Sequence, residues 1–438
     1  MFDVASHVRA ALWALQFQDR RTEGLWSLTD GEWRDLLSHR DFFRCMVPLR
    51  QTCGDQIPDW VRLKIDQRLE DNAERLERIK GQYSRFSDAL RCIGASHLVI
   101  KGFTLWPGFV DHPRFRLQSD IDIYCPPESI LAAHNVLVEL GYAPETQVDF
   151  RYADHLPTMV PKSTWKWRGN VYDPEMPVSF ELHHSLWNEK VMRLRPTGLD
   201  QFWNRRVERR LDGISFPALS EVDTFGYAAL HLTRNLLREQ PSLHQIYELA
   251  RFLNVYAENT SFWKGWKAAQ DDSLRRLEAI SCQTAVMCFA CHLPAEIERE
   301  IAGLPVAVTT WFDKFTGLPM SPQSHPRRDW VWLHVSLVES FRERLSVLRD
   351  MLLPTQVTTL EHIDRLDSQS GKQEVGRSPI QRRSRYIAFV CLRLVFYLRL
   401  TTSTLWRGAR FWWSTKGARG RFHNRGRANS SLNCVPEE

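Results

Sequence analysis

The sequence lacks any run of 18 uncharged apolar residues, so it excludes an ordinary membrane-spanning helix. It also lacks an internal repeat. The first 21 residues contain Asp3 and no long apolar stretch, so no secretion signal is expected there. The nine cysteines are odd in number and distributed along the chain, which favours a reduced, cytoplasmic setting over a disulfide framework.

The chain is long enough, at 438 residues, for two or three domains with hydrophobic cores. Its net charge of +6 is unevenly distributed. Residues 377–427 contain thirteen Lys or Arg and no Asp or Glu, while the rest, without the terminal Glu437 and Glu438, has 45 basic and 50 acidic residues. A mildly acidic body therefore carries a strongly basic tail.

The apolar spacing predicts an α+β protein, in which a small mixed β-sheet core is flanked by N-terminal and C-terminal helical regions. The expected parts are helices over 1–95, an α/β core over 96–190, a helical domain over 191–350, a linker over 351–385 and a basic amphipathic tail over 386–438. Within the core we expect strands at 97–100, 119–125 and 178–187, a turn into a helix from 101, and a helix over 126–142 with Gly141 at its end.

Two aspartates stand one residue apart in "SDIDIYC", between β-forming residues. Asp120 and Asp122 should project from the same face of a strand, roughly 6.6 Å apart along it. Such a pair can bind one or two Mg²⁺ ions, and two-metal phosphoryl chemistry typically uses a third carboxylate from a neighbouring strand. Glu181, on the polar face of the later strand, is the candidate. The alternatives are an ordinary solvated strand face and, for Glu181, a pairing with an arginine.

The surrounding motifs resemble a bacterial family of largely uncharacterised proteins within the polymerase-β-like nucleotidyltransferase superfamily. The segments that carry the resemblance are "LVIKGFTLW", "RLQSDIDIYCPPESILAAHNVLVELGY" and "FELHHSL". Members show Lys-Gly, an Arg four residues before the aspartate strand, a helix ending in Gly-Tyr, and an acidic residue followed by Leu-His. These features fall on Lys101 and Gly102, Arg116, Asp120 and Asp122, Gly141 and Tyr142, and Glu181 to His183, and the resemblance spans roughly residues 5–260.

The resemblance implies a Mg²⁺- or Mn²⁺-dependent nucleotidyltransferase fold in which Lys101, Gly102, Arg116 and Ser119 surround the nucleotide phosphates. The superfamily's usual Gly-Ser or Gly-Gly turn is Lys-Gly here, so a serine hydroxyl is missing from the phosphate-binding turn. Backbone amides after Gly102 can serve instead as an anion site at a helix N-terminus. The structural alternatives are packing of the Lys101 stem at a sheet edge, an Arg116 salt bridge that orients Asp120, and a strand-initiating Ser119.

Other polar and aromatic residues are secondary candidates. His183 could support the metal ligands or bind an acceptor, and His155 lies in the preceding loop. Trp165, Trp167 and Trp187 could stack on a base or sugar, although packing is the ordinary role of such residues.

The expected activity is transfer of an NMP from an NTP such as ATP to a hydroxyl-bearing acceptor, which is a small molecule, a glycan intermediate, a protein or an RNA. A catalytically degenerate nucleotide-binding or scaffold protein and a tRNA-modifying toxin or defence component are the alternatives. The tail over 386–427 suits an anionic membrane surface. It also suits a helix docked on the body, or nucleic acid. We therefore expect a cytoplasmic protein, with peripheral attachment at the inner face of the membrane through this tail.

Overall fold

The computed structural model describes residues 5–39, 42–145, 154–315, 329–352 and 398–413, with single positions at 387, 391, 395 and 415. The chain forms two compact units, Phe2–Leu304 and Pro305–Glu438. The first unit contains the β-sheet and the carboxylates singled out above, and the described part of the second is helical.

The first unit begins with helices α1 (Ser6–Ala14), α2 (Glu23–Trp26), α3 (Asp30–Ser38), α4 (Met46–Cys53) and the 34-residue α5 (Asp59–Cys92), with 3₁₀ helices η1 (Phe43–Cys45) and η2 (Gly54–Gln56). The strands follow: β1 (Leu98–Val99), β2 (Asp120–Tyr124), β3 (Tyr142–Pro144), β4 (Met159–Pro161), β5 (Ser179–His183), β6 (Val207–Leu211) and β7 (Ile214–Ala218). Between them lie η3 (Gly102–Leu105), η4 (Pro113–Phe115), α6 (Ile130–Glu139), α7 (Glu189–Met192) and α8 (Asp200–Asn204).

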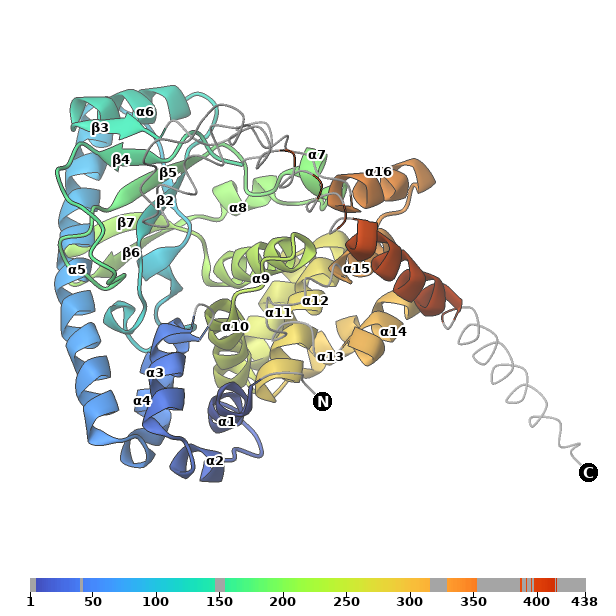
Figure 1. Ribbon diagram of the computed structural model, residues 1–438. Coiled ribbons are helices and arrows are strands. Elements are labelled where there is room, and N and C mark those ends of the chain that lie inside the picture. Colours follow the sequence, from blue (N-terminus) through green and yellow to red (C-terminus); the bar gives the residue numbers. More distant parts are fainter. Residues whose placement is uncertain are drawn as a thin grey trace, which may run out of the picture. The chain divides into compact units, whose positions relative to one another are not determined.

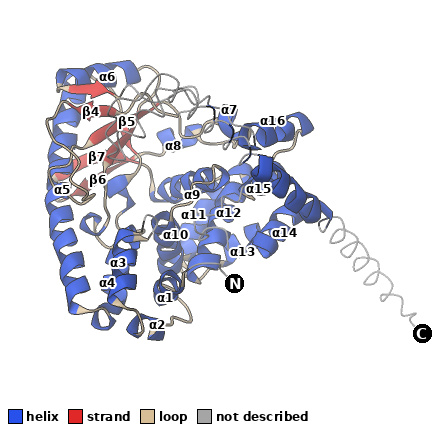
Figure 2. Ribbon diagram, viewed as in Figure 1, coloured by secondary structure: helices blue, strands red, loops and turns tan. Residues whose placement is uncertain are grey.

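The seven strands form one mixed sheet in the order β3-β4-β5-β2-β1-β7-β6. The pairs β2–β5 and β1–β7 are parallel, and the remaining pairs are antiparallel. Figure 2 shows these strands together beside α5 and α6. The predicted α+β class with a mixed sheet is confirmed.

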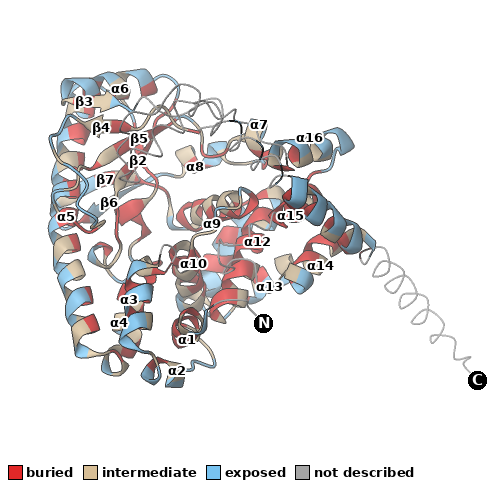
Figure 3. Cartoon of the chain, in the orientation of Figure 1, coloured by how far each residue is buried: buried red, intermediate tan, exposed pale blue. Residues whose placement is uncertain are grey.

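Helix α5 covers one face of the sheet because it carries an apolar stripe at three- and four-residue spacing. Leu76, Ile79, Tyr83, Phe86 and Leu90 are buried in one cluster with the inward-facing strand residues and with α6. Figure 3 shows the buried side of α5 turned toward the strands, with exposed residues on its other side. The apolar face of β2 and β5 is therefore closed to water, which leaves their polar face for function.

Helices α9 (Glu221–Leu237), α10 (Leu243–Tyr256), α11 (Thr260–Ala269), α12 (Asp272–Phe289) and α13 (Ala295–Ala302) complete the first unit. Helix α9 packs against α10, α11 and α12 (Figure 1). Phe225, Phe252, Trp263 and Trp266 form an aromatic cluster between them, with ring centroids 5.1–6.5 Å apart. These ring contacts, one stacked and the others edge to face, make the bundle a rigid support for residues on α9 and α10.

The second unit contains α14 (Val306–Phe315), α15 (Trp330–Leu337), α16 (Phe341–Leu352) and a helix over 398–413. Gly408 of that last helix lies against the ring of Trp332, where a Cβ atom would come within 2.0 Å. Arg407 donates to Asp329 at 2.8 Å. None of the described helices has both the length and the apolar character needed to cross a membrane.

The structure differs from the sequence expectation at three places. The helix expected over 126–142 ends at Glu139, and Tyr142 begins strand β3 instead. The hairpin β6–β7 lies in a region expected to be helical. Its Asp212–Gly213 turn has positive φ at both residues, and Asp-Gly between alternating segments is a strong hairpin signal that the helical expectation overlooked. The expected helix after Lys101 is only the four-residue η3, because Pro107 follows it closely.

Glu278 of α12 is a fully buried carboxyl group in the helical bundle, where one oxygen accepts a hydrogen bond from Trp266 Nε1 at 2.6 Å. Burial raises its pKa to about 8. Because the folded state holds this proton more tightly than the unfolded state, the free energy of unfolding should fall by a few kcal/mol as pH rises from about 4.5 to about 8. Glu278→Gln should flatten this dependence in urea unfolding curves, while Glu298→Gln on exposed α13 should leave it unchanged.

Candidate active site

The parallel pairing of β2 with β5 determines where the acidic residues meet. Asp120 pairs with Ser179, Asp122 with Glu181, and Tyr124 with His183. Side chains alternate along each strand, so the isoleucines of β2 enter the core while these polar residues share the opposite face. The register therefore sets the Asp122 and Glu181 carboxylates side by side on neighbouring strands.

Asp122 is the most strongly held group of this face. Its Oδ1 lies 2.5 Å from Lys101 Nζ and accepts a hydrogen bond from His183 Nε2 at 2.9 Å. Burial works to raise the pKa of Asp122, but Lys101 and His183 hold it well below its ordinary value. In return, Asp122 raises the pKa of Lys101 against the opposing effect of burial. Asp122 and Lys101 therefore each favour the charged form of the other.

His183 links Asp122 to two further carboxylates. Its Nε2 is 3.7 Å from Glu181 Oε2, and its Nδ1 is 3.9 Å from Asp154 Oδ2. Burial opposes the charged imidazolium, yet hydrogen bonding to Asp122 and Glu181 raises the pKa of His183. Asp154 in turn pairs with Arg234, which brings α9 against this face of the sheet.

The atoms best arranged to hold a metal ion belong to Asp122, Glu181 and His183. One ligand atom from each lies within 4.8 Å of the others, the one such group among the described residues. Asp120 lies outside this group. Burial, with the nearby charges of Asp122 and Glu181, raises the pKa of Asp120 to about 6. The two carboxylates suit Mg²⁺ or Mn²⁺, while the imidazole favours a transition-metal ion over Mg²⁺, so the donor set fits a divalent cation.

The sequence interpretation missed the residue that holds the aspartate strand in place. Arg75 of α5 is fully buried and donates to the carbonyl oxygens of Gln118 at 2.8 Å, Ser119 at 3.2 Å and Met176 at 2.6 Å. It therefore joins the chain entering β2 to the chain entering β5. The sequence did contain a signal for this role, because Arg75 lies beside the apolar stripe of a helix. A guanidinium buried there requires hydrogen-bond acceptors from other parts of the chain.

Gly102 adopts φ +71° and lies directly against the Gln118 side chain. A Cβ atom there would meet Gln118 atoms at 2.2–2.5 Å. Gln118 Nε2 donates to the backbone oxygen of Asp120 at 2.7 Å, so this close approach supports the first aspartate. Lys101, just before, points its ammonium at Asp122 rather than lying along a sheet edge.

Arg116 does not pair with Asp120, as one sequence interpretation had it. Its Nε donates to Glu248 of α10 at 2.8 Å. Ser119 precedes β2, and its carbonyl oxygen accepts from Arg75. Both residues thus lie at the entrance to the strand, and their predicted roles toward phosphates stay predictions.

The remaining candidates have structural contacts of their own. His155 forms a bridge with His183 and lies 5.3 Å from it between ring centroids. The indole of Trp187 is buried and donates to the Leu194 carbonyl at 2.9 Å, which is a packing role. Trp165 donates to Asp173 at 3.1 Å and contacts the exposed Trp167 edge to face.

Two cysteines near the end of α12 have Cys-x-x-Cys spacing, so the expectation that the cysteines show no metal-ligand spacing was wrong. Cys288 and Cys291 are separated by two residues, and both are buried. Burial raises the pKa of Cys288 and raises that of Cys291 to about 12. Among the described residues they belong to no group of three or more metal-ligating side chains, so this pair packs the core.

A mixed sheet that presents acidic residues from adjacent parallel strands beside a lysine defines a site of the nucleotidyltransferase kind. Residues 44–291 match the model of a protein family described as an uncharacterised nucleotidyltransferase. The match covers more than half of the chain, and the chain belongs to this family. No curated protein and no solved structure matches it significantly. The predicted family is thereby confirmed.

Gly102→Ala should perturb the site through its backbone. The new methyl group must displace Gln118, and an alanine at positive φ adds strain, so we expect a loss of roughly 2 kcal/mol in the free energy of unfolding. The matched control is Gly81→Ala in α5, where a Cβ atom would meet nothing within 4 Å. That control should be neutral or stabilising by up to about 1 kcal/mol. Equal effects of the two substitutions in chemical denaturation would contradict the assigned role of Gly102.

Proposed function

We propose that the protein transfers a nucleoside monophosphate from an NTP to an acceptor hydroxyl, with a divalent cation held by Asp122, Glu181 and His183. The observation that supports this most directly is the group of ligand atoms within 4.8 Å on two in-register parallel strands. Membership of the nucleotidyltransferase family supports the reaction class. Asp120 adds a further carboxylate on the same face of β2.

The bound cation, Mg²⁺ or Mn²⁺, would offset negative charge on the phosphates. Lys101 provides a positive charge beside Asp122 for the same phosphates, and Arg116, which is paired with Glu248, lies at the entrance to β2. The acceptor oxygen forms a bond to the α-phosphorus as the bond to pyrophosphate breaks. Glu181, whose side chain is 22% exposed against 5% for Asp122, is the carboxylate best placed to take the hydroxyl proton.

A second candidate is a nucleotide-binding protein that has lost catalysis. The Lys101 ammonium pairs directly with Asp122 and so occupies the place beside this carboxylate that a metal ion would otherwise take. In an active enzyme the same lysine must give way to the cation. The two candidates therefore differ in whether divalent cations bind at Asp122.

Glu181→Gln should lower both Mn²⁺ affinity and nucleotidyl transfer by at least about tenfold, because it removes one charged ligand. Asp122→Asn should abolish both, although it also leaves Lys101 buried without its partner. The measurements are calorimetric titration with Mn²⁺ and labelling of cell-extract acceptors from α-³²P-labelled NTPs.

The matched control is Glu208→Gln on exposed β6, which removes a carboxylate from the same sheet far from the ligand group. It should bind Mn²⁺ and label acceptors as wild type does. Labelling by folded Glu181→Gln and Asp122→Asn proteins at the wild-type level would refute the catalytic proposal. Failure of wild type to bind Mn²⁺ would favour the catalytically inactive candidate.

We also propose that the C-terminal tail attaches the protein to an anionic membrane surface. The helix over 398–413 buries Leu400, Thr404, Gly408 and Phe411 at three- and four-residue spacing. It leaves large apolar side chains and arginines exposed: Leu398, Arg399, Leu405, Trp406, Arg410 and Trp413. Exposed aromatic residues within a segment that has no acidic residue suit the interface of an anionic bilayer. Apart from single positions at 387, 391, 395 and 415, the rest of the predicted tail lies outside the described residues.

Full-length protein should co-sediment with vesicles containing phosphatidylglycerol and not with neutral phosphatidylcholine vesicles. The double substitution Trp406→Ser and Trp413→Ser should weaken this binding about tenfold or more, because it removes the two aromatic side chains that would be buried in the bilayer interface. Trp26→Ser, which removes a 70%-exposed tryptophan from the first unit, is the control and should bind normally. Unchanged binding by the double variant, or no binding by wild type, would rule out the attachment.

A further inference from the structure

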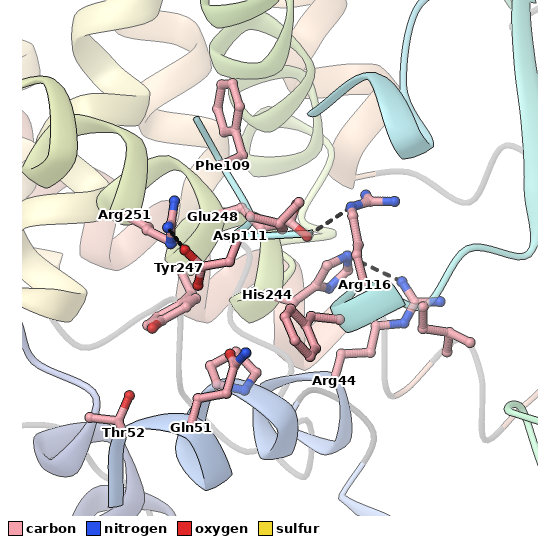
Figure 4. A pocket seen from close by; sticks show the side chains of 14 residues that line it. Arg44, Gln51, Thr52, Phe109, Asp111, Arg116, His244, Tyr247, Glu248 and Arg251 are labelled. Atoms are coloured by element: carbon pink, nitrogen blue, oxygen red, sulfur yellow. Dashed lines mark hydrogen bonds and ion pairs between the residues drawn. The ribbon is translucent and has the colours of Figure 1, made fainter. Parts of the chain in front are cut away.

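A cavity of about 250 Å³ lies beside the entrance to β2, within the first unit. It is bounded by residues near α4, by the loop over 109–117 and by one side of α10 (Figure 4). Arg116 and Leu117 form part of its wall, and Asp120 lies three residues after Leu117 in the chain. The same short segment that forms this wall continues into β2, so the cavity lies next to the start of the strand that carries the carboxylates.

Three arginines from separate elements line the cavity, and two of them have carboxylate partners. Arg116 pairs with Glu248 at 2.8 Å, and Arg251 pairs with Asp111. Arg44 of η1 has no carboxylate within ion-pair distance among the described residues, and its Nε has no hydrogen-bond partner. The three arginines of the lining thus outnumber its two carboxylates, Asp111 and Glu248.

His244 orients Arg44 without adding charge. Its Nε2 lies 3.2 Å from Arg44 Nη1, and its Nδ1 lies 2.6 Å from Ser242 Oγ. Burial and the nearby Arg44 and Arg116 hold the pKa of His244 well below its ordinary value. The neutral ring, with Nε2 assigned as acceptor from this network, fixes the guanidinium at the cavity wall (Figure 4). The partly buried Arg44 guanidinium has no carboxylate of the described chain segments in ion-pair contact, and an anionic ligand in the cavity would supply that contact.

The rest of the wall combines aromatic and hydrogen-bonding groups. Phe109, Phe115 and Tyr247 provide rings, while Gln51 and Thr52 provide an amide and a hydroxyl. The cavity volume lies just below the usual range for ligand pockets, so the cavity has room for a small metabolite but not for a segment of a macromolecule.

We propose that this cavity binds the acceptor, and that the acceptor is a small hydroxyl-bearing metabolite with a phosphate or carboxylate group held by Arg44. The assignment rests on the proposed nucleotidyl transfer and specifies its second substrate. The anionic group would anchor the molecule at Arg44, and its hydroxyl would extend past Arg116 toward the carboxylates.

The test is calorimetric titration of the full-length protein, without divalent cation, using inorganic phosphate and acetate as separate probes. Wild type should bind at least one of them, and the stronger of the two identifies the anionic group. Arg44→Gln should weaken that binding about tenfold or more, because a charged hydrogen-bonding partner is lost. The matched control is Arg50→Gln on neighbouring α4, whose guanidinium pairs with the half-exposed Asp66 outside the cavity and which should bind as wild type does.

A second measurement separates this inference from the proposed function. Binding of Mg²⁺–NTP by Arg44→Gln should stay within about twofold of wild type, while transfer to extract acceptors should fall. Equal anion binding by Arg44→Gln and wild type, or loss of Mg²⁺–NTP binding in Arg44→Gln, would overturn the acceptor assignment and leave nucleotidyl transfer standing. Failure of the wild-type protein to bind Mg²⁺–NTP would instead refute the proposed function itself.

Discussion

The parallel register between β2 and β5 is the constraint on which the site depends. It places Asp122 opposite Glu181 and brings His183 within hydrogen-bond distance of Asp122. A buried carboxylate is costly unless cationic partners surround it, and Lys101 and His183 meet that need. A shift of the register by one residue would turn the acidic side chains into the apolar core against α5, so the hydrophobic face also enforces the arrangement of the site.

The rest of the first unit holds this register and borders the site with positive charge. Arg75 binds the carbonyl groups that lead into both strands, and Gly102 gives Gln118 room to support Asp120. Arg234 on α9 and Arg116, paired with α10, connect the helical bundle to the sheet. Acidic residues at the centre with arginines at the edge are consistent with the proposed reaction between a triphosphate and a small anionic acceptor.

The local sequence pattern was enough to predict some of the candidate site residues but not others. Asp120, Asp122 and Glu181 were recognisable because strand periodicity and the family resemblance act over short segments. The grouping of His183 with Asp122 and Glu181 was not, because it follows from pairing between strands about sixty residues apart in sequence. Arg75 and Arg44 escaped notice for the same reason, since their partners come from distant segments. The β6–β7 hairpin differs from these cases, because its Asp-Gly turn is a local signal in the sequence. The region around it was nevertheless predicted to be helical.

By itself the sequence determined the α+β class, the family and the strand with two same-face aspartates, because alternation of apolar and polar residues and short motifs are properties of neighbouring residues. Only the tertiary structure decided which residues surround Asp122, which carboxylate pairs with Arg116, and that Arg44 faces a cavity without a carboxylate partner. Those outcomes depend on how separate helices and strands pack, and the electrostatic cost of burying each charge is settled only when its neighbours are in place.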